Sequence, residues 1–448
     1  MNNWGKLFSE KRLIWSPGRG WSIKKTSERD SRSPFERDYC RVLYSTAFRR
    51  LAGKTQVFPR PNVDHVRNRL THSLEVSSIA YSILREFTDR YYRKVGVRLA
   101  NIDDAGWIVR TAGLSHDIGN PPFGHAGERA ICTWASEFLK EEYPFLRSCR
   151  DFASFDGNAQ GFRFLSHPDL MYSSDSICLT AASLSAIVKY PWSIYEKPKD
   201  SIKCGAFTSE SDIFDLVMDE VGLKMGQNTY RRHPLSFVLE AADDISYVLS
   251  DIEDAIYMGI LSDSAQANLY ERLMDAKCPI SGKLKWRNAI RSSIADKLIR
   301  DYSKAILDSI DGIFSGEIIE EEDFSKHLSR KTYQWVQEVK QYRTYIFRDK
   351  DIRDAEKMGG ERVKDILTRL SEILKFVGSS KKSPSKSMNS VIENTIGIET
   401  FEERRLESQD WWAHMIVDYV SGMTDRYVDV VWGKVITKGS TTRRCRRG

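Results

Sequence analysis

Long segments with apolar residues at helical spacing constrain the fold of this chain more than any other feature. Residues 69–87, RLTHSLEVSSIAYSILREF, carry apolar residues with a period near 3.6, and residues 234–256, PLSFVLEAADDISYVLSDIEDAI, carry a second apolar stripe at helical spacing. A third such segment, residues 103–120, stops at a glycine and a following proline pair, because proline cannot continue a helix. Alternating β-strand patterns are sparse. The sequence therefore predicts an all-α fold.

Composition divides the 448 residues into regions. Residues 1–34 are polar and weakly patterned, which predicts an irregular N-terminal arm. Helical patterning follows in residues 35–260, which we expect to form the core, and continues in residues 261–433, which we expect to complete the site. Within this second region, residues 377–390, VGSSKKSPSKSMNS, are polar and rich in serine and lysine, so they predict a mobile linker.

The last residues of the chain, 434–448, hold six lysine or arginine residues and no acidic residue. The net charge of +6 therefore equals the charge of this tail, and the remainder of the chain is balanced. A basic tail can bind the phosphates of nucleic acid, although most such tails are solvated and frayed. Single-stranded nucleic acid is thus a candidate regulatory partner.

Targeting and membrane signals are lacking in the sequence. The first residues contain no apolar run of signal-peptide length, and the uncharged run 176–188 has only 13 residues, too few to span a bilayer. The seven cysteines are scattered without C-x-x-C spacing, which indicates neither a zinc knuckle nor a disulfide framework. We expect a soluble, cytoplasmic protein with no membrane partner.

The stretch GLSHDIGNPPFGHAGE, residues 113–128, concentrates ionisable side chains around a stiff loop. His116 lies four residues after an alanine of the apolar stripe, so it should face inward, and Asp117 follows it at the helix end. His72 lies on the apolar face of residues 69–87. These three side chains are therefore expected at inward positions.

A line of polar residues runs along the predicted helix 234–256. Asp243, Tyr247 and Asp251 are spaced i, i+4 and i+8, so they share one line that points away from the apolar stripe. The line alone is as consistent with an exposed face as with a polar cavity.

Inward-facing imidazoles and carboxylates need partners, because an unpaired buried carboxylate costs several kcal/mol or shifts its pKa until it is neutral. A divalent metal would satisfy them, and nitrogen and oxygen ligands suit Mn, Fe, Zn, Ni or, less well, Mg. Taken singly, each of these residues is more often an ordinary core or surface residue, and only their combination with the loop favours a metal. The expected ligands are His72, His116, Asp117 and Asp243.

A second histidine and carboxylate follow the loop. His125 and Glu128 are spaced i and i+3, which makes them neighbours on one helix face. A carboxylate beside an imidazole orients it and raises its basicity, as general acid–base chemistry requires. The loop is expected to fix this pair near the metal ligands.

These motifs resemble the HD superfamily of metal-dependent phosphohydrolases. A longer ordered set resembles, more narrowly, the bacterial deoxyguanosine triphosphate triphosphohydrolases (dGTPases). That set comprises AFRRLAGKTQVFP, NRLTHSLEV, HDIGNPPFGHAGE, FDGNAQGFR, VKYPW, EAADDISY, DIEDAI and DYVSGMTDRY, and it stretches from about residue 35 to residue 427.

The resemblance implies an all-helical HD fold that hydrolyses a dNTP to deoxynucleoside and inorganic triphosphate, with Mn2+ or Mg2+ as cofactor, or Fe, Co, Ni or Zn in its place. It also implies a homo-oligomer, with a hexamer as the family expectation. His125 and Glu128 would be the catalytic pair, beside the four metal ligands given above. The residues expected to contact substrate are Gln56, Arg69, Asn158, Lys189, Tyr247, Asp251 and Glu356. Among these, Gln56 would lie near the 3′-hydroxyl, and Tyr247 would stack under the sugar and exclude a 2′-hydroxyl.

Base recognition is where the chain departs from the family pattern. Glu356 falls where a base-facing glutamate is expected, but the accompanying arginine lies in or near a variable stretch and has no assigned position. The rival enzymatic interpretations are another HD phosphohydrolase, such as a nucleotidase or phosphodiesterase, and a broad dNTPase regulated by nucleotides or nucleic acid. A non-enzymatic HD protein would have lost a metal ligand, and all four expected ligands are retained.

Overall fold

The computed structural model describes most of the chain. The described residues are 4–16, 20–25, 31–58, 64–96, 101–167, 177–199, 201–262, 264, 267–268, 271–272, 283–318, 324–346, 348–380 and 382–437. The expected basic tail therefore lies outside the described residues from 438 onward.

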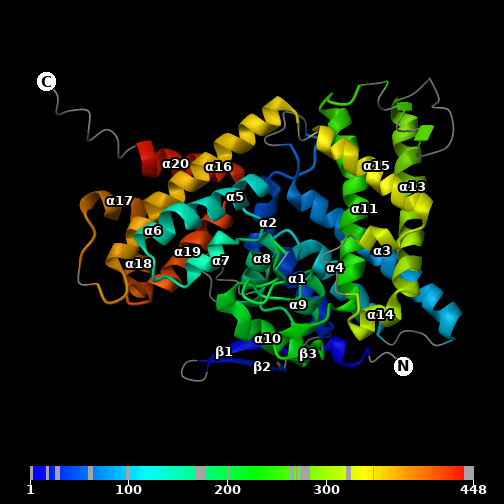
Figure 1. Cartoon of the computed structure of the whole chain (residues 1–448), viewed down its shortest axis with the longest axis horizontal. Helices are drawn as coiled ribbons and strands as arrows, with labels where there is room; N and C mark the ends of the chain where they lie inside the picture. The colour runs from blue at the N-terminus through cyan, green and yellow to red at the C-terminus, as the bar shows by residue number, and fades with distance from the viewer. Residues whose placement is uncertain are drawn as a thin grey trace.

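Helices form almost all of the regular structure (Figure 1). The first half contains α1 (Pro34–Tyr44), α2 (Thr46–Arg50), α3 (Arg69–Val95), α4 (Ile102–Ser115), α5 (His125–Trp134), α6 (Lys140–Glu142), α7 (Ser148–Ala153), α8 (Gly157–Ser166), α9 (Ala181–Ile187), α10 (Ser211–Glu220) and α11 (Pro234–Tyr257). The second half contains α13 (Lys283–Asp308), α14 (Ile310–Ser315), α15 (Arg330–Ile346), α16 (Lys350–Ser371), α17 (Lys386–Asn394), α18 (Ile398–Arg404), α19 (Gln409–Ser421) and α20 (Asp425–Trp432). Among the described residues, the strands pair as two small antiparallel hairpins and nothing larger, so the predicted all-α class is confirmed.

The N-terminal arm contains regular structure at residues 12–16 and 20–24, which corrects the expectation of an irregular arm for that part of residues 1–34. Strands β1 (Arg12–Ser16) and β2 (Gly20–Lys24) form an antiparallel hairpin. Arg12 anchors the hairpin, since its buried guanidinium pairs with Asp38 of α1 and donates to the carbonyl of Cys178 at 2.7 Å. Each strand is only five residues long and is flanked by charged residues, so the alternation is too short to stand out in the sequence.

The expected linker at residues 377–390 is partly helical. Residues 386–390 form the first part of α17, and the side chain of Ser385 caps the helix by accepting from the backbone N–H of Met388. The side chain of Met388 is buried against the C-terminal core. The linker expectation is therefore wrong for residues 386–390, because a capping serine and a buried methionine start a helix within a polar stretch. The second strand hairpin, β3 (Lys224–Gly226) with β4 (Thr229–Tyr230), lies just before α11.

Two apolar cores hold the helices together. The first surrounds α3, α4 and α11, which contact one another and also α1, α9 and α13. The second lies between α5, α16, α19 and α20. Figure 1 shows these two groups side by side, with α3, α11, α13 and α15 on the right and α5, α16, α19 and α20 on the left. The proposed division of the chain at residue 260 stays a prediction.

The helix ends next to the motifs are well defined by their capping residues. Asn68 caps α3 by accepting from the backbone N–H of Thr71 at 3.0 Å, and the Thr71 hydroxyl accepts from the Asn68 N–H in return. His233 caps α11, with Pro234 at the first helical position. These caps fix the starting points of the two helices that carry His72 and Asp243.

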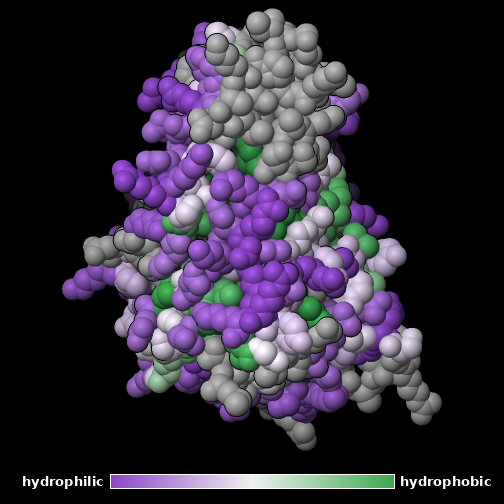
Figure 2. Space-filling view, turned by 90° about the vertical axis from the view of Figure 1, so that its right-hand side faces the viewer, coloured by the Kyte–Doolittle hydropathy of each residue, from purple (hydrophilic) through white to green (hydrophobic). Residues whose placement is uncertain are grey.

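Figure 2 shows the face that carries α13 and α15. Hydrophilic residues dominate the coloured part of this face, and apolar residues are scattered among them. Among the described residues, the helices are all too short or too polar to cross a membrane.

Acid should destabilise the fold through His233. This residue is fully buried, its Nδ1 accepts from the Leu235 N–H at 3.1 Å, and its Nε2 donates to the Leu7 carbonyl at 3.3 Å. Burial lowers the pKa of His233 from 6.5 to about 4. The unfolded state then binds the extra proton between these pH values, so stability falls as pH drops from about 6.5 to 4, by about 3 kcal/mol at most.

Denaturant unfolding at pH 7 and pH 4.5 should show this difference. His233→Asn retains a capping oxygen but cannot titrate, so its loss of stability on acidification should be smaller than that of wild type. His65→Asn is the control, because His65 is exposed and its change should leave the pH dependence as it was. Equal slopes for wild type and His233→Asn would contradict the assignment.

Candidate metal centre and central cavity

Four side chains from three separate elements converge between the two cores. The Nε2 of His72, on α3, lies 3.0 Å from Oδ1 of Asp243, on α11. The Nε2 of His116, at the end of α4, lies 3.6 Å from the same oxygen and 3.7 Å from Oδ1 of Asp117. Donor atoms of His72, His116 and Asp117 all lie within 4.8 Å of one another. The structure thus brings the four expected ligands to one point.

The protonation of His116 is set by its other ring nitrogen. Its Nδ1 lies 2.8 Å from the carbonyl oxygen of Gly113, and a carbonyl can only accept, so Nδ1 carries the proton. The Nε2 atom is then an unprotonated lone-pair donor that faces the two carboxylates. It is buried and has no hydrogen-bond partner. A metal cation is the partner that such an atom fits.

Both carboxylates at this point are held in the ionised form. Burial by itself would raise the pKa of Asp117, but the charge of Arg69 and its hydrogen bond outweigh burial and hold it well below its usual range. Burial likewise opposes ionisation of Asp243, and its hydrogen bond with His72 lowers its pKa overall. Oδ2 of Asp117 is a further buried atom without a hydrogen-bond partner. Two imidazoles, two carboxylates and these orphaned atoms fit a divalent metal.

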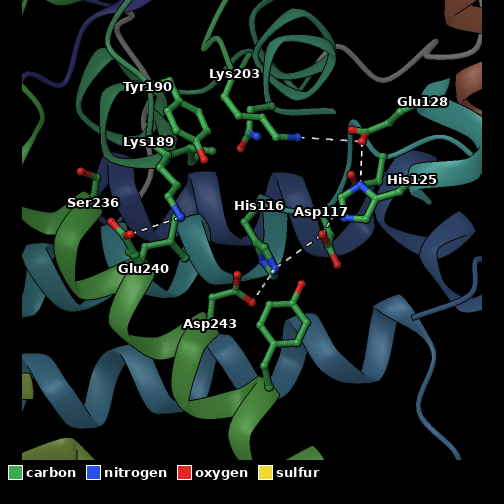
Figure 3. Close-up of a pocket in the computed structure, with 15 residues that line it drawn as sticks. His116, Asp117, His125, Glu128, Lys189, Tyr190, Lys203, Ser236, Glu240 and Asp243 are labelled. Carbon is green, nitrogen blue, oxygen red and sulfur yellow. Dashed lines mark hydrogen bonds and ion pairs between the residues drawn. The ribbon is translucent and has the colours of Figure 1, made fainter. Parts of the chain in front are cut away.

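A cavity of about 230 Å3 opens beside the four side chains (Figure 3). Its lining consists of His116, Asp117, Asn120, His125, Glu128, Asn158, Ile187, Lys189, Tyr190, Lys203, Ser236, Leu239, Glu240, Asp243 and Tyr247. Four of these residues are acidic and two are lysines. An anionic ligand would therefore meet a net negative wall unless a cation occupied the metal centre.

His125 and Glu128 lie on this wall, at the start of α5. The Nδ1 of His125 is 2.8 Å from Oε2 of Glu128, while Oε1 of Glu128 accepts from the Gly157 N–H at 2.9 Å. Burial would raise the pKa of Glu128, but its hydrogen bond with His125 and the charge of Lys203 lower it overall. The His125 side chain is 76% exposed, in contrast to 12% for Glu128. The pair is thus an accessible imidazole oriented by a buried carboxylate.

Three of the expected substrate contacts also line the cavity. Lys189 Nζ lies 3.2 Å from Oε1 of Glu240, and this charge outweighs burial and raises the lysine pKa. Asn158 donates to Oδ1 of Asp156 at 2.8 Å. The ring of Tyr247 stacks on that of His72, with centroids 4.8 Å apart. Lys189 is therefore a cation at the wall, and Tyr247 is packed against a candidate metal ligand.

Other expected contacts do not line this cavity. They are Gln56, Arg69, Asp251 and Glu356. Arg69 instead donates to Oδ1 of Asp117 at 2.8 Å, so it holds a candidate ligand in place. Glu356 lies on α16, 3.7 Å from the guanidinium of Arg129.

Several cavity residues were not singled out from the sequence, among them Asn120, Tyr190, Lys203 and Glu240. Lys203 Nζ lies 3.6 Å from Asp156 and 3.9 Å from Glu128. A lone lysine in the stretch DSIKCGAF gives no signal of this position. Asn120 lies in the motif HDIGNPPFGHAGE and Glu240 in EAADDISY, so their position in these motifs was the sequence signal that could have found them.

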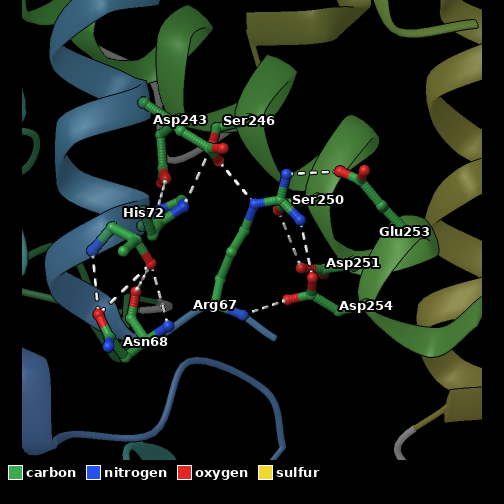
Figure 4. Close-up of polar contacts among 11 residues, drawn as sticks. Arg67, Asn68, His72, Asp243, Ser246, Ser250, Asp251, Glu253 and Asp254 are labelled. Carbon is green, nitrogen blue, oxygen red and sulfur yellow. Dashed lines mark hydrogen bonds and ion pairs between the residues drawn. The ribbon is translucent and has the colours of Figure 1, made fainter. Parts of the chain in front are cut away.

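The start of α3 is tied to α11 by Arg67 (Figure 4). Its guanidinium pairs with Asp254 at 2.7 Å and with Glu253 of α11, and also with Glu75 of α3 at 2.8 Å. The His72 Nδ1 meets the hydroxyl of Ser246 on α11 at 3.2 Å. These contacts fix α3 relative to α11, and so fix His72 relative to Asp243.

The loop between Asp117 and His125 is held from the C-terminal region. Phe123 adopts a positive φ of 60°, which is unusual for a bulky residue. Its backbone N–H donates to Oδ1 of Asp425 at 3.0 Å, and Oδ2 of Asp425 accepts from the Thr55 N–H at 3.0 Å. Asp425 is the first residue of α20 and is buried. The strained turn is therefore fixed by a residue far along the chain.

Lys54 makes a second set of hydrogen bonds that hold the same loop. Its Nζ donates to the carbonyls of Asn120 at 2.6 Å and Ser421 at 2.8 Å. Burial, followed by the charges of Arg50 and Arg69, lowers the pKa of Lys54 to about 7. The loop is thus fastened to both α19 and the segment before α3.

The chain is similar to known proteins along nearly its whole length. Residues 69–156 match the model of the HD domain. A deoxyguanosinetriphosphate triphosphohydrolase-like protein of Synechocystis is 32% identical, covering 94% of this chain and 96% of the relative. One from Pseudomonas aeruginosa is 30% identical, covering 95% of this chain and 96% of the relative. The chain belongs to the deoxyguanosinetriphosphate triphosphohydrolase-like family.

A further relative, the deoxyguanosinetriphosphate triphosphohydrolase of an Enterobacter species, is 28% identical, covering 90% of this chain and 93% of the relative. The HD match in this triphosphohydrolase-like chain begins at the first residue of α3 and ends just before α8. It includes His72, His116 and Asp117 but not Asp243, which joins the centre from α11.

Removing the Asp425 carboxylate should destabilise this triphosphohydrolase-like protein. Asp425→Ala leaves the buried Phe123 N–H without its acceptor and releases the strained turn, so we expect unfolding free energy to fall by about 2 to 4 kcal/mol. Asp429→Ala, on the same helix, is the control. It breaks a partly exposed pair with Arg362 and should cost less than about 1 kcal/mol. Chemical denaturation measures both, and equal losses would show that Asp425 has no special role.

Proposed function

We propose that this chain is a metal-dependent hydrolase of deoxynucleoside triphosphates, with a preference for dGTP, that releases deoxynucleoside and inorganic triphosphate. The single observation that carries the proposal is the convergence of His72, His116, Asp117 and Asp243 beside an accessible His125 oriented by Glu128. The names of relatives that align over nearly the whole chain supply the substrate class.

The four converging residues would hold the metal. A bound divalent cation would supply positive charge toward the phosphates and lower the pKa of a water molecule. Arg69 would keep Asp117 ionised and oriented, because the two are already paired at 2.8 Å. Lys189, on the opposite wall, would neutralise charge on the triphosphate.

The His125–Glu128 pair would handle the proton. With Nδ1 bound to Oε2 of Glu128, the Nε2 of His125 is the atom left to deliver a proton to the leaving 5′-oxygen. The Gly157 N–H holds the other oxygen of Glu128, so the carboxylate cannot rotate away. Lys203 adds a positive charge 3.9 Å from Glu128.

Base and sugar recognition are the finer parts of the proposal. Tyr247 is the candidate for exclusion of a 2′-hydroxyl, since it lines the cavity next to the metal centre. Gln56, Asn158, Asp251 and Glu356 stay predicted substrate contacts. Of these, Glu356 is the proposed base contact, on the helix that packs against α5. A hexamer, and regulation by nucleotides or single-stranded nucleic acid, also stay predictions.

The reaction is tested by its products. Each dNTP is incubated with the protein and Mn2+ or Mg2+, and the products are separated by ion chromatography. We expect inorganic triphosphate, formed fastest from dGTP, and no turnover after chelation. His116→Ala should lose both turnover and bound metal, which elemental analysis measures independently of activity. Orthophosphate or pyrophosphate as the first product would instead support a different HD phosphohydrolase.

Glu128→Gln should lower kcat by a factor of about 10² to 10⁴ while leaving metal content unchanged. The amide keeps an oxygen for the Gly157 N–H but lacks the charge that orients His125 and supports its protonated form. The matched control is Glu137→Gln, because Glu137 is an exposed partner of Lys364. Steady-state kinetics gives the comparison, and near wild-type kcat for Glu128→Gln would remove the pair from the proposed chemistry.

Tyr247→Ala should weaken the discrimination between dGTP and GTP. The ratio of kcat/KM for the two nucleotides measures this directly. Tyr247→Phe keeps the ring stacked on His72 and should retain the wild-type ratio, which separates sugar selection from support of the metal centre. A Tyr247→Ala enzyme that rejects GTP as strongly as wild type would end this assignment.

A further inference from the structure

A second and larger cavity lies away from the metal centre. It has a volume of about 1260 Å3 and is lined by Lys140 of α6, by residues 144–151 and Ala153, by Thr208–Glu210, and by the start of α19. It shares no lining residue with the central cavity. Figure 1 shows α6, α7 and α19 together on the left of the molecule. We call it the α7–α19 cavity.

Unpaired positive charge marks this cavity. Lys140, Arg147 and Arg150 are exposed lining residues, and none forms an ion pair with an acidic residue of the described chain. The guanidinium of Arg150 lies 5.6 Å from the ring centre of Tyr195. Guanidinium groups so placed suit a phosphate, to which they donate two hydrogen bonds at once.

The acidic residues of the lining are already engaged. Asp151 accepts from the backbone N–H groups of Thr208 and Ser209 at 2.8 and 3.2 Å. Asp410 accepts from the Ser148 N–H at 2.9 Å. Glu210 pairs with the buried guanidinium of Arg163. Lys140, Arg147 and Arg150 are thus left to face a ligand.

Exposed aromatic rings line the same cavity. Phe145 is 96% exposed and Tyr195 is 69% exposed, and both are lining residues together with the partly buried Trp411. The apolar faces of a large aromatic ring gain no stabilisation from contact with water, and each face can instead stack on the planar ring of a ligand. Aromatic rings interleaved with unpaired cations are typical of sites that take a base and its phosphate.

Two buried polar atoms in the lining have no hydrogen-bond partner. They are Nδ1 of His414 and the hydroxyl of Ser148, both on side chains more than nine-tenths buried. Burial, followed by the charge of Arg163, lowers the pKa of His414 to about 3, so its ring is neutral and can accept or donate one hydrogen bond. Such atoms cost free energy unless a ligand or water satisfies them.

We propose that the α7–α19 cavity is a second ligand site, which binds a nucleotide with its phosphate on Arg147 and Arg150, its base against the exposed aromatic rings, and polar groups on His414 and Ser148. The ligand class follows from the lining, because it offers cations for an anion, flat rings for a planar ring, and buried polar atoms for hydroxyl or amino groups. This site is independent of the hydrolysis proposed above.

Photolabelling of the full-length protein with 8-azidoadenosine 5′-monophosphate tests the site by its location. We expect labelled peptides from residues 140–150, 195 and 408–414, and protection by unlabelled AMP but not by inorganic phosphate alone. The double variant Arg147→Ser with Arg150→Ser should raise the half-saturating concentration for this labelling by about tenfold or more. Label in the central cavity would appear on different peptides, so the experiment distinguishes the two sites.

The matched control is Lys94→Ser with Lys386→Ser, which removes the same charge from exposed positions elsewhere and should leave labelling unchanged. Circular dichroism verifies that both double variants are folded. Label confined to the central cavity, or cavity label that is insensitive to the arginine changes, would overturn the proposal. Either result would leave the hydrolase proposal standing, because the readout here is binding and not turnover.

Discussion

The placement of ionised carboxylates beside imidazoles at a buried point is the constraint on which the rest of the structure depends. Asp117 is almost fully buried and Asp243 is partly buried, yet their surroundings keep the pKa of both below the ordinary value. Arg69 satisfies one oxygen of Asp117, and His72 satisfies one of Asp243. Other buried lone pairs, such as that of Nε2 of His116, have no hydrogen-bond partner. The group is therefore not a closed network of ion pairs, and the free lone pairs suit a bound cation.

Contacts between distant parts of the chain hold those groups together. Arg67 fastens the start of α3 to the far end of α11, and Asp425 fastens the turn at Phe123 to α20, 302 residues later in the sequence. The strained φ of Phe123 persists because its N–H has a buried carboxylate acceptor. The C-terminal helices are thus part of the support for the HD motif, even though the domain match ends at residue 156.

The central cavity and the α7–α19 cavity differ in how the charges of their linings are balanced. The central cavity has more carboxylates than lysines and suits an anion only together with a metal. The α7–α19 cavity has unpaired cations and engaged acids, and so attracts an anion by itself. The helix α8 passes both, since Asn158 lines the first cavity and Arg163 lines the second.

The sequence by itself determined the all-α class, the helix faces of His72 and Asp243, and the pairing of His125 with Glu128. Each of these follows from local rules, because apolar periodicity fixes which face of a helix is buried and i, i+3 spacing makes neighbours. The hairpin β1–β2 and the start of α17 were not predicted from the sequence. The hairpin has too few residues to show a clear alternation, and the start of α17 depends on a single capping residue.

Only the tertiary structure decided which side chains share a cavity. It added Lys203 and Glu240, joined Arg69 to Asp117, and left Gln56 and Asp251 outside the lining. These outcomes depend on how helices from distant parts of the chain pack against one another. Residue spacing within one helix sets a direction from its axis, whereas the distance to another helix is set by the side chains that fill the space between them.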